Sequence, residues 1–139
     1  MGPTQPNGRS TPAAWGGTGI EVLGASDFVN TSLDRPGLYI VCFAAEWCPV
    51  TRRFMPRFLG FRIPPGGRLA IADITDLNSP LWDTFRIRIT PSVLVFREGA
   101  VVERLDGRRF LGILGRDFER LQSTLSSAGG PVSVAPPRP

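Results

Sequence analysis

Cys48 is the residue of this chain that is best placed to do chemistry. It follows an apolar run from Leu38 to Ala45 and comes just before a stretch with helical spacing, Thr51 to Phe61. A strand that passes into a helix leaves its junction residue at the helix N-terminus, where unpaired backbone N–H groups and the helix dipole favour an anion. A cysteine at such a point has a lowered pKa, and its thiolate is the nucleophile. The pattern therefore predicts a nucleophilic thiol at position 48.

The composition excludes several other kinds of catalytic site. The chain has no histidine, so it cannot build a Ser-His pair, a Cys-His pair or a histidine–metal site from its own residues. Its two cysteines, Cys42 and Cys48, are too few for a disulfide scaffold, and neither has a set of metal-ligand partners. We therefore expect no metal and no cofactor.

Arginine supplies every cationic side chain of the protein. All sixteen cationic residues are arginine, and the formal net charge is +4. A local group, Arg52, Arg53 and Arg57, follows Cys48. One interpretation is a solvated helix face; the other is attraction to an acidic partner or a raised potential near the thiol. Nucleic-acid binding is not expected, because no motif that combines aromatic and basic residues supports it.

The thiol must be positioned by a sheet with helices around it. Short apolar runs rich in β-branched residues predict strands, and apolar residues at i, i+4 and i+7 predict helices. Strands are expected at 20–23, 38–44, 69–74, 92–96 and 101–105, and helices at 28–33, 51–61, 81–85 and 117–125. Alternation of strands and helices favours a parallel sheet, and the last two strands form a hairpin. The predicted fold class is α/β: a central mixed β-sheet flanked by helices on both faces, with a β-hairpin and a C-terminal helix at the end.

We expect one domain between two disordered tails. Residues 1–18 and 128–139 are rich in Gly, Pro, Ser and Thr and lack periodicity, which leaves a domain at 19–127. Trp15 is the one bulky residue of the first tail, and the sequence leaves open whether it is loose or docks on the domain. No apolar run approaches the roughly 20 residues that span a bilayer, and the N-terminus lacks the pattern of a signal peptide. The expectation is a cytoplasmic protein; a domain excised from a longer luminal or secreted chain would read the same.

Several motifs in register resemble the thioredoxin superfamily, whose redox motif reads Trp-Cys-Gly-Pro-Cys. The residues that carry the resemblance are Trp47, Cys48, Pro56, Thr90, Pro91, Gly99 and Gly107. The fourth motif position holds Thr51 in place of the second cysteine. The resemblance covers roughly residues 22–124, and it implies a thioredoxin-like fold.

The resemblance also assigns roles to the residues around the thiol. It implies a cis peptide bond before Pro91, with the Thr90 backbone free to pair with an extended substrate segment. Trp47 and Pro49 would contact the substrate; core packing is the alternative for Trp47. Cys42 stands where the family usually has a buried acid. We expect it to be a small buried apolar residue that supports the site, and the alternative is a resolving thiol that pairs with Cys48.

The implied activity is thiol–disulfide exchange in cell redox homeostasis. Thr51 can donate a hydrogen bond to the Cys48 thiolate, but it cannot attack a sulfur, so an outside thiol must complete the reaction. The chain would then be a monothiol oxidoreductase or an isomerase-like enzyme. Its partners would be protein disulfides or thiol-containing clients, with glutathione or a reductase beside them and no membrane. The alternative is a redox-inactive binding module that holds a client or partner protein.

Overall fold

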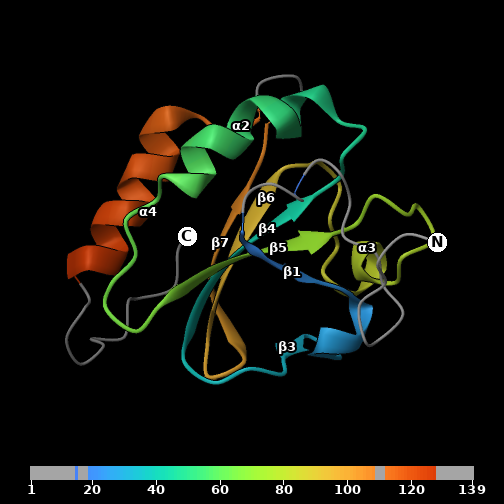
Figure 1. The fold of residues 1–139 in the computed structure, drawn as a ribbon, viewed down its shortest axis with the longest axis horizontal. Coiled ribbons are helices and arrows are strands. Elements are labelled where there is room, and N and C mark those ends of the chain that lie inside the picture. Colours follow the sequence, from blue (N-terminus) through green and yellow to red (C-terminus); the bar gives the residue numbers. More distant parts are fainter. Residues whose placement is uncertain (1–14, 16–18, 109–111, 128–139) are drawn as a thin grey trace.

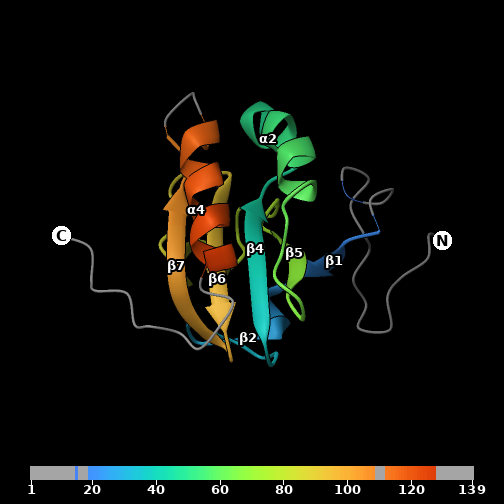
Figure 2. The ribbon, with the colours of Figure 1, turned by 90° about the vertical axis from the view of Figure 1, so that its left-hand side faces the viewer.

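The centre of the molecule is a mixed sheet of five strands in the order β1-β5-β4-β6-β7. The computed structural model describes residue 15 and residues 19–108 and 112–127 of the 139-residue chain. The strands are β1 (Glu21–Leu23), β4 (Leu38–Ala44), β5 (Arg68–Asp73), β6 (Ser92–Arg97) and β7 (Ala100–Asp106). β1, β5 and β4 run parallel, whereas β6 and β7 pair antiparallel, and Figure 2 shows the five side by side.

Two layers of shorter elements cover the two faces of this sheet (Figure 1). One face carries α2 (Pro49–Leu59) and α4 (Gly115–Ser127). The other carries the 3-10 turn η1 (Ala25–Asp27), a hairpin of β2 (Phe28–Val29) and β3 (Ser32–Leu33), and α3 (Leu81–Thr84). The mixed sheet, the helices on both faces, the β6–β7 hairpin and the final helix confirm the predicted fold class.

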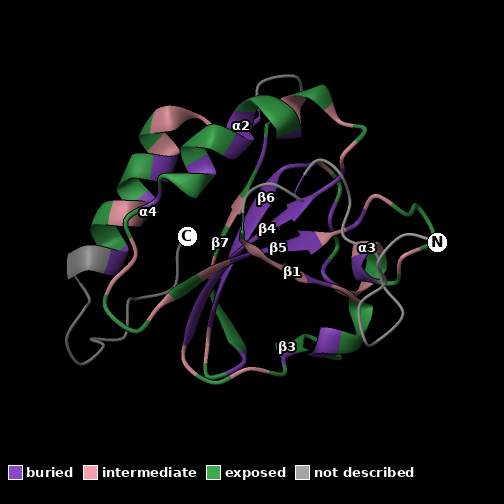
Figure 3. Ribbon diagram, in the orientation of Figure 1, coloured by how far each residue is buried: buried purple, intermediate pink, exposed green. Residues whose placement is uncertain are grey.

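β4 is the strand on which both cores meet. All seven of its residues are buried, as Figure 3 shows for the middle of the sheet. Successive side chains of a strand point to opposite faces, so Ile40 and Cys42 pack under α2 and α4 while Val41 and Phe43 pack on the other side. The nearly continuous apolar sequence of β4 therefore follows from its central position.

The helix predicted at residues 28–33 is wrong. The chain there forms the β2–β3 hairpin, in which Phe28 pairs with Leu33 and Val29 with Ser32. Asn30 adopts φ 53°, a conformation that asparagine tolerates better than most residues and that tight hairpin turns require. Phe28 and Leu33 then both reach the same buried cluster. Core packing of these two residues prevails over a weak helical pattern.

The ends of the helices also differ from the sequence prediction. α2 begins at Pro49 instead of Thr51, and α4 begins at Gly115, two residues before the predicted Asp117. Proline suits the first helical position because its missing N–H would have no partner there. The start at Pro49 makes Cys48 the N-cap residue of α2.

The predicted tails lie outside the described residues, apart from Trp15. That side chain is only 2% exposed and belongs to the core cluster between the sheet and the helices α2 and α4. The question that the sequence left open is thus settled: Trp15 docks on the domain. In the part of the chain that the structure describes, no helix is both long and apolar enough to cross a membrane.

Replacing Trp15 by alanine tests this docking. We expect Trp15→Ala to lower the free energy of unfolding by about 3–5 kcal/mol, because a large buried side chain is removed and a cavity remains. Urea unfolding followed by circular dichroism measures the change. Val102→Ala is the control, since Val102 is 47% exposed and its loss should cost within about 0.5 kcal/mol. A loss below about 1 kcal/mol for Trp15→Ala would contradict the docked position.

Candidate active site

Cys48 lies at the point where the central strand passes into α2. A short turn follows β4, and the Cys48 N–H donates to the carbonyl of Ala45 at 3.1 Å. The Cys48 carbonyl in turn accepts the first helical hydrogen bond, from the N–H of Arg52 at 3.1 Å. The thiol is half-buried and free, so it sits at the positive end of a helix of 11 residues with access to solvent.

The loop before β6 forms the wall opposite the thiol. Sγ of Cys48 lies 3.7 Å from the carbonyl oxygen of Thr90, to which the thiol donates a hydrogen bond. The Thr90–Pro91 peptide bond is cis, and both residues are buried. The hydroxyl of Ser92 donates to the carbonyl of Ile89 at 2.7 Å and holds the loop in place. The structure thus brings Cys48, Thr90 and Pro91 together.

Thr51 lies in the first turn of α2, on the buried side of the thiol. Its side chain is fully buried, and its hydroxyl oxygen makes no hydrogen bond to any described residue. The hydroxyl is therefore available to the sulfur. A buried hydroxyl without a partner is costly, which makes an interaction with a thiolate favourable at this position.

The surroundings of Cys48 lower its pKa. Partial burial is the largest single influence and acts in the opposite direction, because it disfavours the charged form. The hydroxyls of Thr90 and Thr51 and the backbone of Thr51 and Val50 are placed to donate hydrogen bonds to a thiolate at this position, and their stabilisation of the charged form together outweighs the burial. The site therefore holds a larger fraction of thiolate near neutral pH than an ordinary cysteine does.

Cys42 takes no part in this arrangement as a second thiol. It is fully buried in the middle of β4, it is not joined to Cys48, and burial raises its pKa well above the usual value. A thiol that stays protonated is a poor nucleophile. Its place is in the core beneath α2, among the apolar side chains of that cluster.

Trp47 and Pro49, the neighbours of Cys48, are both exposed. The Trp47 side chain is 51% exposed, so it does not fill the core. Its indole N–H donates to the carbonyl of Thr75 at 2.9 Å, and its ring stacks on that of Trp82, with centroids 6.3 Å apart and planes at 12°. Trp47 thus stands on the rim of the site as a fixed apolar surface.

Thr75 is a site residue that the sequence analysis missed. Its hydroxyl accepts a hydrogen bond from the N–H of Glu46 at 2.9 Å and donates to the carboxylate of Asp73, while its carbonyl holds Trp47. It therefore fixes the turn that leads to Cys48 from the side of β5. The parallel strands β4 and β5 end at the same edge of the sheet, so residues that follow β5 lie near those that follow β4. The position of Thr75 just after β5 could therefore have pointed to it.

Two glycines let other segments approach the site closely. A Cβ on Gly107 would lie 2.5 Å from the Pro91 carbonyl oxygen, and one on Gly112 would lie 2.5 Å from Cγ1 of Val50. Gly112 also has φ +69°, which favours glycine. The resemblance singled out Gly107, and it missed Gly112. Gly99, also singled out, lies away from the thiol, where its Cβ would meet the Leu33 carbonyl oxygen at 2.8 Å.

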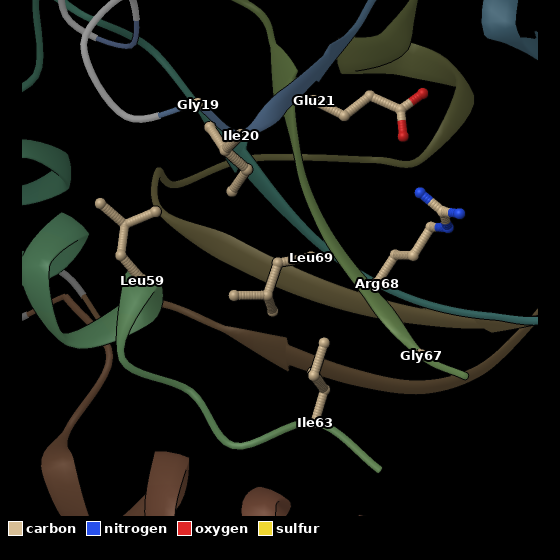
Figure 4. A pocket seen from close by; sticks show the side chains of 8 residues that line it. All are labelled: Gly19, Ile20, Glu21, Leu59, Ile63, Gly67, Arg68 and Leu69. Atoms are coloured by element: carbon tan, nitrogen blue, oxygen red, sulfur yellow. The ribbon is translucent and has the colours of Figure 1, made fainter. Parts of the chain in front are cut away.

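A separate hollow lies away from the thiol. A pocket of about 470 Å³ opens at the far end of α2, where Leu59, Ile63 and Leu69 form its apolar side and Glu21 and Arg68 its edge (Figure 4). None of the sequence-predicted site residues lines it. Among the described residues, no group of three or more cysteine, aspartate or glutamate side chains is placed to hold a metal ion.

Comparison with known proteins gives relatives of one kind. No protein-family model matches the chain. Protein disulfide-isomerase A3 of Gallus gallus is 26% identical over 121 residues, which cover 86% of this chain and 23% of that protein. Chloroplastic thioredoxin X of Arabidopsis thaliana is 29% identical over 85 residues, 60% of this chain and 47% of that protein. The chain thus spans less than half the length of either relative.

Solved structures show the same fold. Thioredoxin f2 of Chlamydomonas reinhardtii superposes with a TM-score of 0.60 at 17% identity, over 76% of this chain and 95% of that one. A mutant thioredoxin of Halobacterium salinarum superposes with a TM-score of 0.57 at 20% identity, over 84% of this chain and 96% of that one. In both cases nearly the whole solved chain is matched, so the likeness covers a complete domain.

Thr51→Val tests the electrostatics of the site. Valine keeps the shape of threonine but removes the hydroxyl, so we expect the pKa of Cys48 to rise toward its ordinary value and the rate of alkylation near neutral pH to fall. The rate of reaction with iodoacetamide, measured against pH, gives the pKa. Thr51→Ser is the matched control, because it retains the hydroxyl and should keep the pKa low. Equal pKa values in the valine and serine variants would rule out the role of the hydroxyl.

Proposed function

Because the chain belongs to the thioredoxin superfamily, we propose that it carries out thiol–disulfide exchange through Cys48 alone. The observation that carries this proposal is the placement of a half-buried thiol with a lowered pKa at the N-cap of α2, 3.7 Å from the Thr90 carbonyl. The names of the relatives, a disulfide isomerase and thioredoxins, support the same class of chemistry.

The first step is attack on a client disulfide. The Cys48 thiolate attacks one sulfur of that disulfide, a new bond forms between Sγ and the client sulfur, and the client S–S bond breaks. The second client sulfur leaves as a thiolate and takes a proton from solvent. The groups that favour the Cys48 thiolate before the attack, chiefly the side chains of Thr90 and Thr51, no longer face a charge once the mixed disulfide has formed.

The second step needs a thiol from outside the chain. Position 51 holds threonine, and the Cys42 thiol is buried with a raised pKa, so neither can attack the mixed disulfide. We propose a low-molecular-weight thiol such as glutathione, or the thiol of a reductase. Its thiolate attacks Sγ of Cys48 and releases the client as a second thiolate. A second outside thiolate then removes the first as a disulfide and restores Cys48, so two electrons reach the client in all.

The client would lie along the loop before β6. Thr90 and Pro91 face the thiol, and an extended segment that adds to the Thr90 backbone would present its disulfide to Sγ. Trp47 and Pro49 stand exposed beside this path and would contact the same segment. The proposed substrates are therefore protein disulfides in extended or unfolded segments.

A binding module is the second candidate function. The observation that favours it is the absence of a resolving thiol within reach: Thr51 stands in the first turn of α2, and Cys42 is buried. In that case the surface around Trp47 and Pro91 would hold a client without exchange. Client binding that survives Cys48→Ser, with no disulfide reduction by the parent chain, would favour this function.

Cysteine variants separate the single-thiol mechanism from its alternatives. We expect Cys48→Ser to abolish reduction of a peptide–glutathione mixed disulfide, whereas Cys42→Ala should keep the rate, because only the Cys48 sulfur is accessible. Thr51→Cys should add a resolving thiol and make turnover with a dithiol reductant faster. Rates are measured with glutathione in excess, and mass spectrometry follows the adduct on Cys48.

Two results would contradict this mechanism. Loss of activity in a folded Cys42→Ala variant would show that the buried cysteine resolves the mixed disulfide. Unchanged activity in Cys48→Ser would place the chemistry elsewhere. Circular dichroism of each variant confirms that the fold is retained before rates are compared.

A further inference from the structure

Trp47, next to the thiol in the chain, and Trp82 form a stacked pair, which we call the indole pair; Trp47 is exposed, and Trp82 is partly buried against the core. The rings are nearly parallel, at 12°, with centroids 6.3 Å apart. Each indole N–H is satisfied by a backbone carbonyl, that of Thr75 for Trp47 at 2.9 Å and that of Asp76 for Trp82 at 3.2 Å. Because the two acceptors are consecutive residues, the pair is held as one unit. The Trp47 ring is half exposed, and its open face is apolar because its one polar group, the indole N–H, already has an acceptor.

The indole pair is continuous with the proposed exchange site. Trp47 directly precedes Cys48, and Trp82 lies in α3, on the same chain segment that leads to Thr90. Because Trp47 is exposed and directly precedes Cys48, we expect a client segment whose cysteine reaches Sγ to contact the open face of Trp47. Client residues that flank the attacked cysteine on the side of Trp47 can make this contact.

Three acidic residues adjoin the indole pair or its hydrogen-bond partners along the chain. Glu46 adjoins Trp47, Asp83 adjoins Trp82, and Asp76 supplies the carbonyl that holds Trp82. None of the three forms an ion pair, since the ion pairs of the described residues involve Arg35, Arg104 and Arg108. The exposed side chain of Arg86, just after α3, forms none with them either. The residues that adjoin the two tryptophans thus carry carboxylates without an ion-pair partner, in a chain of net positive charge.

The helix that begins just after the thiol carries the other sign. Arg52, Arg53 and Arg57 of α2 are exposed, and α2 contains no acidic residue. A cationic client residue would be repelled there and attracted on the side of the tryptophans. The charges of these segments thus favour a cationic client residue near the tryptophans over one near α2.

We propose that the indole pair binds a cationic side chain of the client, arginine best, next to the cysteine that Cys48 attacks. This inference rests on the proposed exchange function and names its substrate class. Tryptophan is the side chain that attracts cations most strongly over its ring, and the planar guanidinium also stacks on it. The carboxylates of Glu46, Asp76 and Asp83 add attraction that a leucine or phenylalanine of the client would not gain.

Activated peptides test the preference directly. Peptides with a cysteine linked to 5-thio-2-nitrobenzoate carry arginine, citrulline or leucine beside that cysteine, and release of the chromophore gives the rate of attack by Cys48. We expect the arginine peptide to react about two- to fivefold faster than the citrulline peptide, the range that an exposed cation–π contact supplies. High salt should reduce the difference. A leucine peptide that reacts fastest would overturn the inference.

Variants assign the preference to this surface. Trp82→Leu removes the stack while keeping an apolar residue, and Asp83→Asn removes one charge and keeps both rings; each should reduce the preference for arginine. Glu119→Gln, on the exposed part of α4, is the matched control and should leave it unchanged. If the arginine preference persists in both test variants, the inference is wrong. Each variant tests the surface by itself, so poor folding of one leaves the other decisive.

A binding measurement separates this inference from the exchange function. In the Cys48→Ser variant, unreactive peptides are titrated while the indole N–H resonances of Trp47 and Trp82 are followed by NMR. Shifts with the arginine peptide and not with the citrulline peptide support the surface whether or not the parent chain exchanges disulfides. Chromophore release by the parent chain without peptide preference, together with unmoved indole resonances, overturns the inference and leaves the exchange function standing.

Discussion

The burial of β4 on both faces is the constraint on which the rest of the structure depends. A strand that is buried throughout has to lie in the middle of the sheet, and its neighbours then meet it in a fixed register. Ala44, its last residue, pairs with Asp73 of β5, while Phe43 pairs with Ser92 of β6. The segments that leave β5 and enter β6 therefore flank the turn before α2, and they bring Thr75 and Thr90 to the two sides of Cys48.

The sequence predicts those parts of the fold that rest on long, uniform patterns. Residues 38–44 are apolar throughout and form β4 with the expected bounds, because burial on both faces leaves no room for another pattern. Residues 28–33 are different: Phe28, Val29 and Leu33 read as helical spacing, and a positive φ at Asn30 lets Phe28 and Leu33 reach the same core from a hairpin. Trp15 is buried through contacts with residues far along the chain, which local composition does not record.

The candidate site also divides into residues that local patterns predict and residues that depend on distant contacts. Cys48 could be found from a junction of strand and helix, and Thr90 and Pro91 from a resemblance in motif order. Thr75 and Gly112 could not, because each acts through a contact with a distant segment: a hydrogen bond to the turn before Cys48 in one case, close approach to Val50 in the other. The stack of Trp82 on Trp47 likewise joins residues from two distant segments of the chain, and neither residue alone predicts it.

Because position 51 holds threonine and not a second cysteine, the surroundings of the Cys48 thiol take on a larger part in holding and releasing a client. A second cysteine in that turn would release a bound client quickly, because the resolving attack would be intramolecular. In the proposed mechanism the Thr51 hydroxyl favours the attacking thiolate, but the mixed disulfide would persist until an outside thiol arrives. The lifetime of the complex then depends on how well the surface around Cys48 holds the client and how far it admits small thiols. We expect the exposed aromatic surface of Trp47 and the arginines of α2 to act on both quantities, so that the selectivity of the proposed site comes from its rim and not from the sulfur.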